Sequence, residues 1–248
     1  MLDQHIDLGV AVLTMNRPAQ RNAMSFDLVT AMIEACERAG QDTAVGAILI
    51  TGAAPGFCAG SDLAGLSQMD SAGRRQFEAE SGRLARMLAE LSKPVLATVK
   101  NFAIGGGLTL ATSCDIVITD RAARWSLPEV PIGLFPAWGL QSVVSRAGLT
   151  AARRLAWGVD TLNGEEAVRL GLADHLAEHD AFTEGLEIAR KLAALPRAQS
   201  AAVKTYFLAN TTGEAADWLA NRLFTTLSET DTALATFEKF SKRPPPER

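Results

Sequence analysis

The 248-residue sequence predicts an α/β fold followed by a helical C-terminal region, and three observations support this class. Short apolar segments typical of buried strands alternate with helical segments over the N-terminal part of the chain. Two glycine-bearing loops each follow a predicted strand and precede a predicted helix. From about residue 140 onward helical patterns dominate. Strands that alternate with helices at this spacing form βαβ units around a parallel sheet.

The first elements follow from hydrophobic alternation and one helix cap. Residues 6–15 alternate in polarity, which predicts either a strand pair or one bent strand with a glycine turn. Ser25 is a suitable N-cap for a helix over 26–40, where apolar residues recur at helical spacing. The apolar run 47–51 precedes Gly52 and predicts a buried parallel strand.

The middle of the chain repeats the same alternation. A polar amphipathic pattern predicts a helix over 71–91, and the apolar segment 94–99 predicts the next strand. A triple glycine, 105–107, opens a short helix that ends before Asp115. The apolar segment 116–119 then predicts another strand.

The C-terminal part of the chain is predicted to be helical. Helical periodicity is found in six segments: 140–147, 150–157, 164–170, 181–194, 197–210 and 213–240. The proline-rich end, KRPPPER, predicts a frayed tail.

Composition excludes several classes of protein. A net charge of −4 argues against a nucleic-acid binder, because duplex binding relies on clustered Lys and Arg. The sequence has no apolar run of membrane-spanning length, and its N-terminal segment lacks the basic start of a signal peptide. Cys36, Cys58 and Cys114 fit no metal-ligand spacing, and their odd number argues against a disulfide framework. We therefore expect a cytoplasmic protein without a metal site.

The two glycine loops are candidate anion sites. One contains Ala59-Gly60-Ser61 and the other Gly105-Gly106-Gly107. Glycine lets a backbone approach a ligand closely, and the free amides of a helix N-terminus favour negative charge. Two such loops side by side would offer two N–H groups to one developing oxyanion. A purely steric role for these glycines is the alternative, and the dinucleotide pattern G-x-G-x-x-G is not satisfied.

Several segments together resemble signatures of the crotonase (enoyl-CoA hydratase/isomerase) superfamily, in order along nearly the whole chain. They are Asn16-Arg17-Pro18, Arg21-Asn22-Ala23-Met24, 56–63, Lys93-Pro94-Val95, 104–108, 113–116, Pro128-Glu129-Val130, 132–136 and 167–174.

This resemblance implies a fold, an assembly and a substrate class. It implies a spiral of ββα turns over 1–190 and a C-terminal helical trimerisation region over 191–248, with trimers that often pair as hexamers. It implies a coenzyme A thioester as substrate and no separate cofactor. It also assigns the oxyanion hole to the backbone amides of Ser61 and Gly106.

The most informative departure from the family concerns the catalytic carboxylates. Hydratases of the family have two glutamates, whereas this chain has Thr109 at the first position and Glu129 at the second. Threonine is a poor acid or base near neutral pH, but one carboxylate suffices to move a proton from C2 to C4. We therefore predict double-bond isomerisation by Glu129. A hydratase in which Thr109 holds the water is the alternative, and an acyl-CoA binder without catalysis is a second one.

The remaining substrate contacts are also implied by the resemblance. They are Arg21, Ala23, Ala59, Asp62, Leu63, Thr109, Trp138, Phe224 and Lys242. Alternatives stay open for several of them, namely a helix cap for Asp62, trimer core for Trp138, and solvated positions for Arg21 and Lys242. His5, His175 and His179 lie outside every motif, which argues against a serine peptidase related to this fold.

Overall fold

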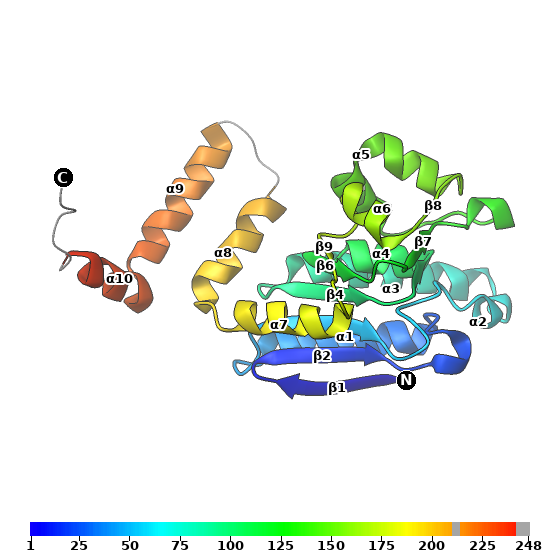
Figure 1. The fold of residues 1–248 in the computed structure, drawn as a ribbon, viewed down its shortest axis with the longest axis horizontal. Helices are drawn as coiled ribbons and strands as arrows, with labels where there is room; N and C mark the ends of the chain where they lie inside the picture. Colours follow the sequence, from blue (N-terminus) through cyan, green and yellow to red (C-terminus); the bar gives the residue numbers. More distant parts are fainter. Residues whose placement is uncertain (210–213, 242–248) are drawn as a thin grey trace.

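The computed structural model describes residues 1–209 and 214–241, with the side chains of residue 216 and of 237–241 left out of the description. Within these ranges the chain forms two sheets with helices around them, followed by a C-terminal group of helices (Figure 1).

The larger sheet has six strands in the order β1-β2-β3-β4-β6-β9. Their bounds are Leu2–Asp7, Val10–Met15, Ala47–Gly52, Val95–Val99, Ile116–Thr119 and His175–Leu176. The pairing of β1 with β2 is antiparallel, and the other neighbours are parallel. Leu8 and Gly9 turn with positive φ angles between β1 and β2, so the segment predicted over 6–15 is a strand pair that begins at Leu2.

The second sheet has three strands, and two of them directly follow strands of the larger sheet in the chain. It contains β5 (Phe102–Ile104), β7 (Arg124–Ser126) and β8 (Thr161–Leu162). Strand β4 is followed by β5 and then by helix α4 (Gly106–Thr112), and β6 is likewise followed by β7. These strands were absent from the predicted elements, because segments of two or three residues are too short to show periodicity.

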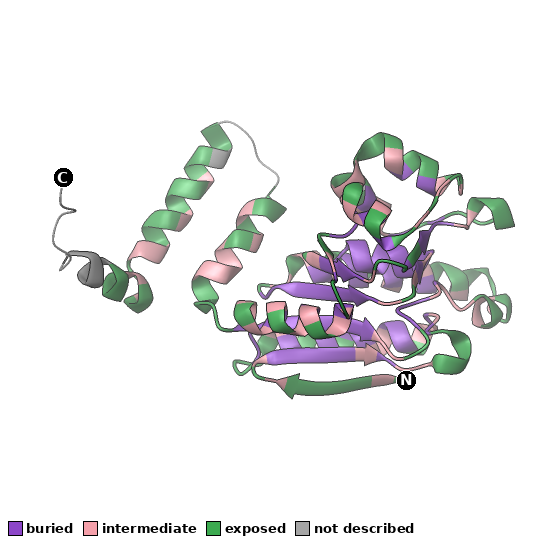
Figure 2. Ribbon diagram, viewed as in Figure 1, coloured by how far each residue is buried: buried purple, intermediate pink, exposed green. Residues whose placement is uncertain are grey.

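The two faces of the larger sheet are covered by different helices. Side chains of β2, β3 and β4 that point to one face pack with α1 (Phe26–Gln41), α3 (Ser71–Glu90) and α4 in the main core. Those on the other face pack with α7 (Ala181–Ala193), whose small residues allow a close approach. The central strands β2, β3 and β4 are accordingly almost entirely buried, whereas the edge strand β1 is mostly exposed (Figure 2).

The remaining helices follow the predicted segments with two differences. Helix α5 (Leu140–Ala156) joins two predicted segments across a kink at Gly148, and α6 is Gly164–Arg169. The segment predicted over 213–240 forms two helices, α9 (Glu214–Ser228) and α10 (Asp231–Ser241). They separate because the Thr230 hydroxyl accepts from the Ala233 amide and so caps α10.

Helices α8 (Arg197–Leu208), α9 and α10 extend away from the sheets (Figure 1). Lys204 fastens α8 to the core, since its Nζ donates to the carbonyls of Leu88 and Lys93 and to Asp115 Oδ2 at 2.8, 3.2 and 2.7 Å. The predicted boundary at 190/191 falls inside α7, and the division into two domains stays a prediction. None of the described helices is long and apolar enough to cross a bilayer.

Candidate active site

A cavity of about 550 Å³ opens where the two glycine loops meet. Its walls come from four segments that are distant in sequence: the loop and short helix α2 (Leu63–Ser67) after β3, the helix α3, the turn from β5 into α4, and the segment 128–138. Apolar side chains line most of it, and Glu78, Glu129 and Arg74 bring charge to it.

The two predicted amides belong to this cavity. Ser61 and Gly106 both line it, and in the described chain neither N–H donates to a protein acceptor. The loops are held together because the Cys58 carbonyl accepts from the Ile104 amide at 3.0 Å. A methyl group built on Gly60 would lie 3.4 Å from the Gly106 nitrogen and 2.9 Å from the Ile104 oxygen. Glycine at position 60 therefore allows the close approach of the two amides.

Glu129 lies against the second glycine loop. Gly105 adopts φ 55° and ψ −126°, and a methyl group built on it would lie 2.5 Å from Oε1 of Glu129. The other carboxylate oxygen, Oε2, is buried and has no hydrogen-bond partner in the described chain. A buried carboxylate oxygen without a partner is costly, which is typical of a group arranged for a ligand rather than for stability.

A second carboxylate, Glu78 on α3, shares the cavity with Glu129. Burial raises the pKa of Glu129, and the negative charge of Glu78 raises it further. Burial also raises the pKa of Glu78. Glu78 was not among the predicted site residues, because it belongs to none of the family motifs and a glutamate on an amphipathic helix is usually solvated.

Comparison with known proteins identifies the family. A family model described as Enoyl-CoA hydratase/isomerase matches residues 5–245. The chain belongs to this family. It is 36% identical over 186 residues to the short-chain-enoyl-CoA hydratase of Clostridium acetobutylicum, which covers 74% of this chain and 71% of that one. It is 32% identical over 229 residues to the 2,3-dehydroadipyl-CoA hydratase of Escherichia coli, covering 90% and 88%.

The fold agrees with this assignment. The crystal structure of an enoyl-CoA hydratase from Mycobacterium smegmatis matches with a TM-score of 0.91 and 27% identity, covering 99% of this chain and 98% of that one. The predicted crotonase fold with C-terminal helices is thereby confirmed, and the protein is an acyl-CoA enzyme of the enoyl-CoA hydratase/isomerase family.

Thr109 and Trp138, both predicted substrate contacts, also line the cavity. Thr109 is buried, and its hydroxyl donates to the Gly106 carbonyl at 3.1 Å, which leaves the oxygen able to accept a hydrogen bond from a ligand. Trp138 lies against Gly106 and forms part of the wall. Ala59 and Leu63 are the other predicted contacts that line the cavity.

Other predicted contacts lie elsewhere. Asp62 caps α2 by accepting from the Gly65 amide and pairs with Arg17 at 2.8 Å, which lowers the pKa of its carboxyl. Arg21, Ala23 and the exposed Phe224 on α9 do not line the cavity, and Lys242 lies outside the described residues. A direct role in binding coenzyme A stays a prediction for these residues.

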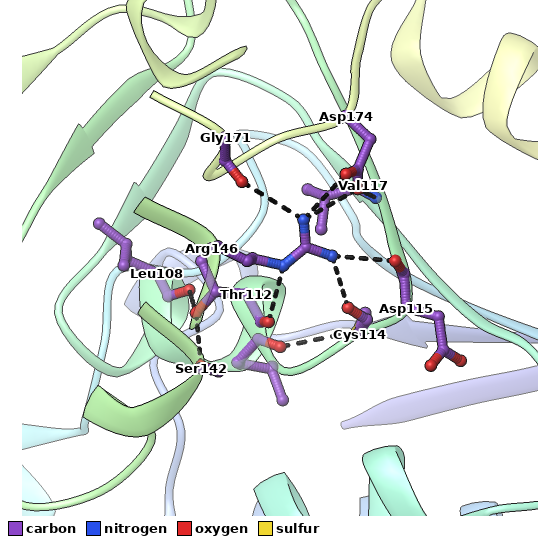
Figure 3. Close-up of polar contacts among 10 residues, drawn as sticks. Leu108, Thr112, Cys114, Asp115, Val117, Ser142, Arg146, Gly171 and Asp174 are labelled. Atoms are coloured by element: carbon purple, nitrogen blue, oxygen red, sulfur yellow. Dashed lines mark hydrogen bonds and ion pairs between the residues drawn. The ribbon is translucent and has the colours of Figure 1, made fainter. Parts of the chain in front are cut away.

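Arg146 on α5 holds the C-terminal end of α4, the helix that begins with the Gly106 amide (Figure 3). Its guanidinium donates to the carbonyls of Thr112, Cys114 and Asp115 at 3.0, 2.7 and 3.0 Å. It also pairs with Asp174 at 2.9 Å. The Arg146 side chain is only 14% exposed, whereas Asp174 is 42% exposed, so the bonds to Thr112 and Cys114 are better shielded from water than the ion pair.

Replacing Arg146 with methionine is expected to lower the free energy of unfolding by about 3 kcal/mol, because several carbonyls would lose a charged donor. Urea unfolding measures this loss. Arg154→Met is the matched control on the same helix, since its side chain is 59% exposed and pairs with Asp160. A similar small loss in both variants would contradict the anchoring role of Arg146.

The raised pKa of Glu129 predicts a pH-dependent stability difference. A carboxyl whose pKa is higher in the folded than in the unfolded state contributes stability at acid pH, and this contribution is lost as pH rises through the folded-state pKa. Glu129→Gln removes this titration, so its melting temperature should exceed that of the parent at pH 8 and approach it at pH 4. Thermal unfolding at both values tests the sign, and an advantage confined to pH 4 would refute it.

Proposed function

We propose that this protein is an enoyl-CoA hydratase that adds water across the C2–C3 double bond of a trans-2-enoyl-CoA. The observation that carries the proposal is the shared cavity. Two backbone amides that bond to no acceptor in the described chain meet there with Glu129, whose Oε2 has no partner among the same residues. The curated relatives described above are named as hydratases, which favours water addition over the isomerisation expected from Thr109 alone.

The proposed chemistry places negative charge at one atom. Addition of water at C3 moves the double-bond electrons toward the thioester oxygen, which becomes an enolate. The Ser61 and Gly106 amides are positioned to donate to this oxygen, and one such donor contributes about 3–4 kcal/mol to transition-state stability. Glu129, whose raised pKa favours the protonated form, would give a proton to C2.

Isomerisation is the second candidate. It requires one carboxylate that removes a proton from C2 and returns it at C4, and Thr109 in place of a glutamate is the specific observation that favours it. Both reactions use the same amides and Glu129, so the cavity alone is compatible with either.

The two candidates differ in what they do to a conjugated thioester. The purified protein is incubated separately with a trans-2-enoyl-CoA and with a 3-enoyl-CoA, and absorbance of the conjugated thioester is followed. Loss of absorbance from the first substrate is the expected result and indicates hydration. A gain from the second substrate without loss from the first would replace the proposal with isomerisation, and tight binding without either change would indicate a non-catalytic binder.

We also propose self-association through the C-terminal helices. Phe207, Trp218 and Phe224 are 75%, 62% and 67% exposed on α8 and α9, and large exposed apolar side chains on neighbouring helices are typical of interfaces. A second copy of the chain, in a homotrimer or a dimer of trimers, would cover them. Light scattering in solution measures the mass, and a monomer would refute the proposal.

A further inference from the structure

We propose that Glu78 is a second catalytic carboxylate, which holds the attacking water and takes its proton. This inference rests on the proposed hydratase function and supplies the group that Thr109 cannot provide. Threonine at that position has no titratable group near neutral pH, whereas hydration requires both a base for water and an acid for C2.

The position of Glu78 follows from the packing of α3. Phe77, its neighbour, is fully buried in the main core and fixes the orientation of the helix. Gly82, one turn after Glu78, faces Trp138, since a methyl group built there would lie 3.7 Å from the Trp138 Cβ. Trp138 in turn reaches Gly106, where a built methyl group would lie 2.9 Å from its Cζ2. Residue 78 therefore lies on the α3 face that forms a wall of the cavity beside the amides.

Glu78 has no structural partner that would explain a half-buried carboxylate. Burial is what raises the pKa of the Glu78 carboxyl. In the described chain no cation pairs with this carboxylate and no donor bonds to it. Arg74, one turn earlier, instead donates from Nε and Nη2 to the Met69 carbonyl at 3.0 and 2.8 Å. On the same helix Glu80 pairs with Arg83 at 3.2 Å, as an ordinary surface glutamate does.

The two carboxyl groups are suited to opposite roles. Two carboxylates in one partly buried site repel each other, so the state with a single proton on the pair is favoured. Burial raises the pKa of both groups, and the negative charge on either one opposes ionisation of the other carboxyl. We assign the proton to Glu129, because it lies against Gly105 beside the Gly106 amide, where C2 of a bound thioester would be, and we assign the ionised state to Glu78. A protonated Glu129 and an ionised Glu78 are the acid and base that water addition needs.

The proposed water addition balances in atoms and charge. The water oxygen bonds to C3 while its proton passes to the Glu78 carboxylate, and the electron pair of the C2–C3 double bond moves to the thioester enolate. The enolate then collapses as C2 takes the proton of Glu129, which gives the 3-hydroxyacyl thioester. One proton returns from Glu78 to Glu129 through water and restores the starting state. The Thr109 oxygen is free to accept a hydrogen bond from the same water.

The test compares Glu78→Gln with Glu80→Gln, a matched change on the same helix outside the cavity. Hydration of a trans-2-enoyl-CoA is measured beside exchange of the C2 proton of a saturated acyl-CoA in deuterium oxide. Exchange needs the amides and Glu129 but no attacking water. We expect Glu78→Gln to lower kcat for hydration by about 10²–10³-fold, with a much smaller effect on exchange and on KM.

The pH profile of kcat/KM gives an independent readout. An ionised base and a protonated acid produce a bell-shaped profile, and Glu78→Gln should remove the fall at low pH while keeping the fall at high pH. Glu80→Gln should match the parent in every measurement.

Three outcomes would overturn the proposal. Hydration by Glu78→Gln within threefold of the parent would exclude catalysis by this carboxylate and leave the hydratase function intact. Equal loss of hydration and exchange would show a structural effect on the whole site. Absence of hydration by the parent protein would instead refute the proposed function, and the role of Glu78 with it.

Discussion

Replacement of Glu129 with glutamine is expected to lower kcat for hydration by about 10³-fold, with little change in KM. Glutamine has nearly the same shape, so it keeps the contact with Gly105, but its amide cannot donate a proton to C2 or remove one from it. The same variant should lose exchange of the C2 proton, because that reaction depends on the same carboxyl group. Steady-state kinetics and deuterium exchange, both with purified folded protein, measure the two effects.

Glu165→Gln is the control for Glu129→Gln. Glu165 lies on the surface, where its carboxylate is 62% exposed and pairs with Arg121, so its loss should leave both reactions unchanged. Activity of Glu129→Gln within fivefold of the parent would contradict the mechanism for hydration and for isomerisation alike, since both assign proton transfer at C2 to this residue.

Gly105→Ala is expected to lower kcat/KM by about 10²-fold or more, because it would displace Glu129, to which we assign proton transfer. The new methyl group would lie 2.5 Å from Oε1 of Glu129, so the carboxyl group or the α4 N-terminus must move. A misplacement of about 1 Å in a catalytic group can cost this factor. The alanine must also adopt φ 55° and ψ −126°, which adds a stability loss of about 1–3 kcal/mol.

The stability loss is separated from the activity loss by Gly148→Ala. Gly148 has φ 75° and ψ 163°, so alanine is similarly strained there, but a methyl group on it meets nothing within 4 Å. Both variants should unfold more easily in urea, whereas only Gly105→Ala should lose activity per folded molecule. Equal activity losses in the two variants would show that general strain, and not displacement of Glu129, is responsible.

Much of the fold could be predicted from local patterns. The apolar runs at β3, β4 and β6 and the Ser25 cap of α1 are properties of short segments, and the structure has these elements within a few residues of the predictions. The short strands β5, β7 and β8 were not predicted. They are stabilised by pairing with segments distant in sequence; the Cys58 backbone, for example, forms a bridge to Ala103. The residues of such a short strand do not indicate which segment it will pair with.

For the site, the order of motifs along the sequence was enough to indicate the family. It also selected Ser61, Gly106 and Glu129 as candidates, because glycine spacing and the position of a glutamate in a motif are read directly from the sequence. Only the tertiary structure decided which side chains share the cavity. It brings Glu78 into the wall through the packing of Phe77 and leaves Asp62 in a cap and an ion pair. The physical reason is that burial and charge coupling between carboxylates depend on distances across the fold, which residues far apart in sequence acquire only when the helices and loops pack together.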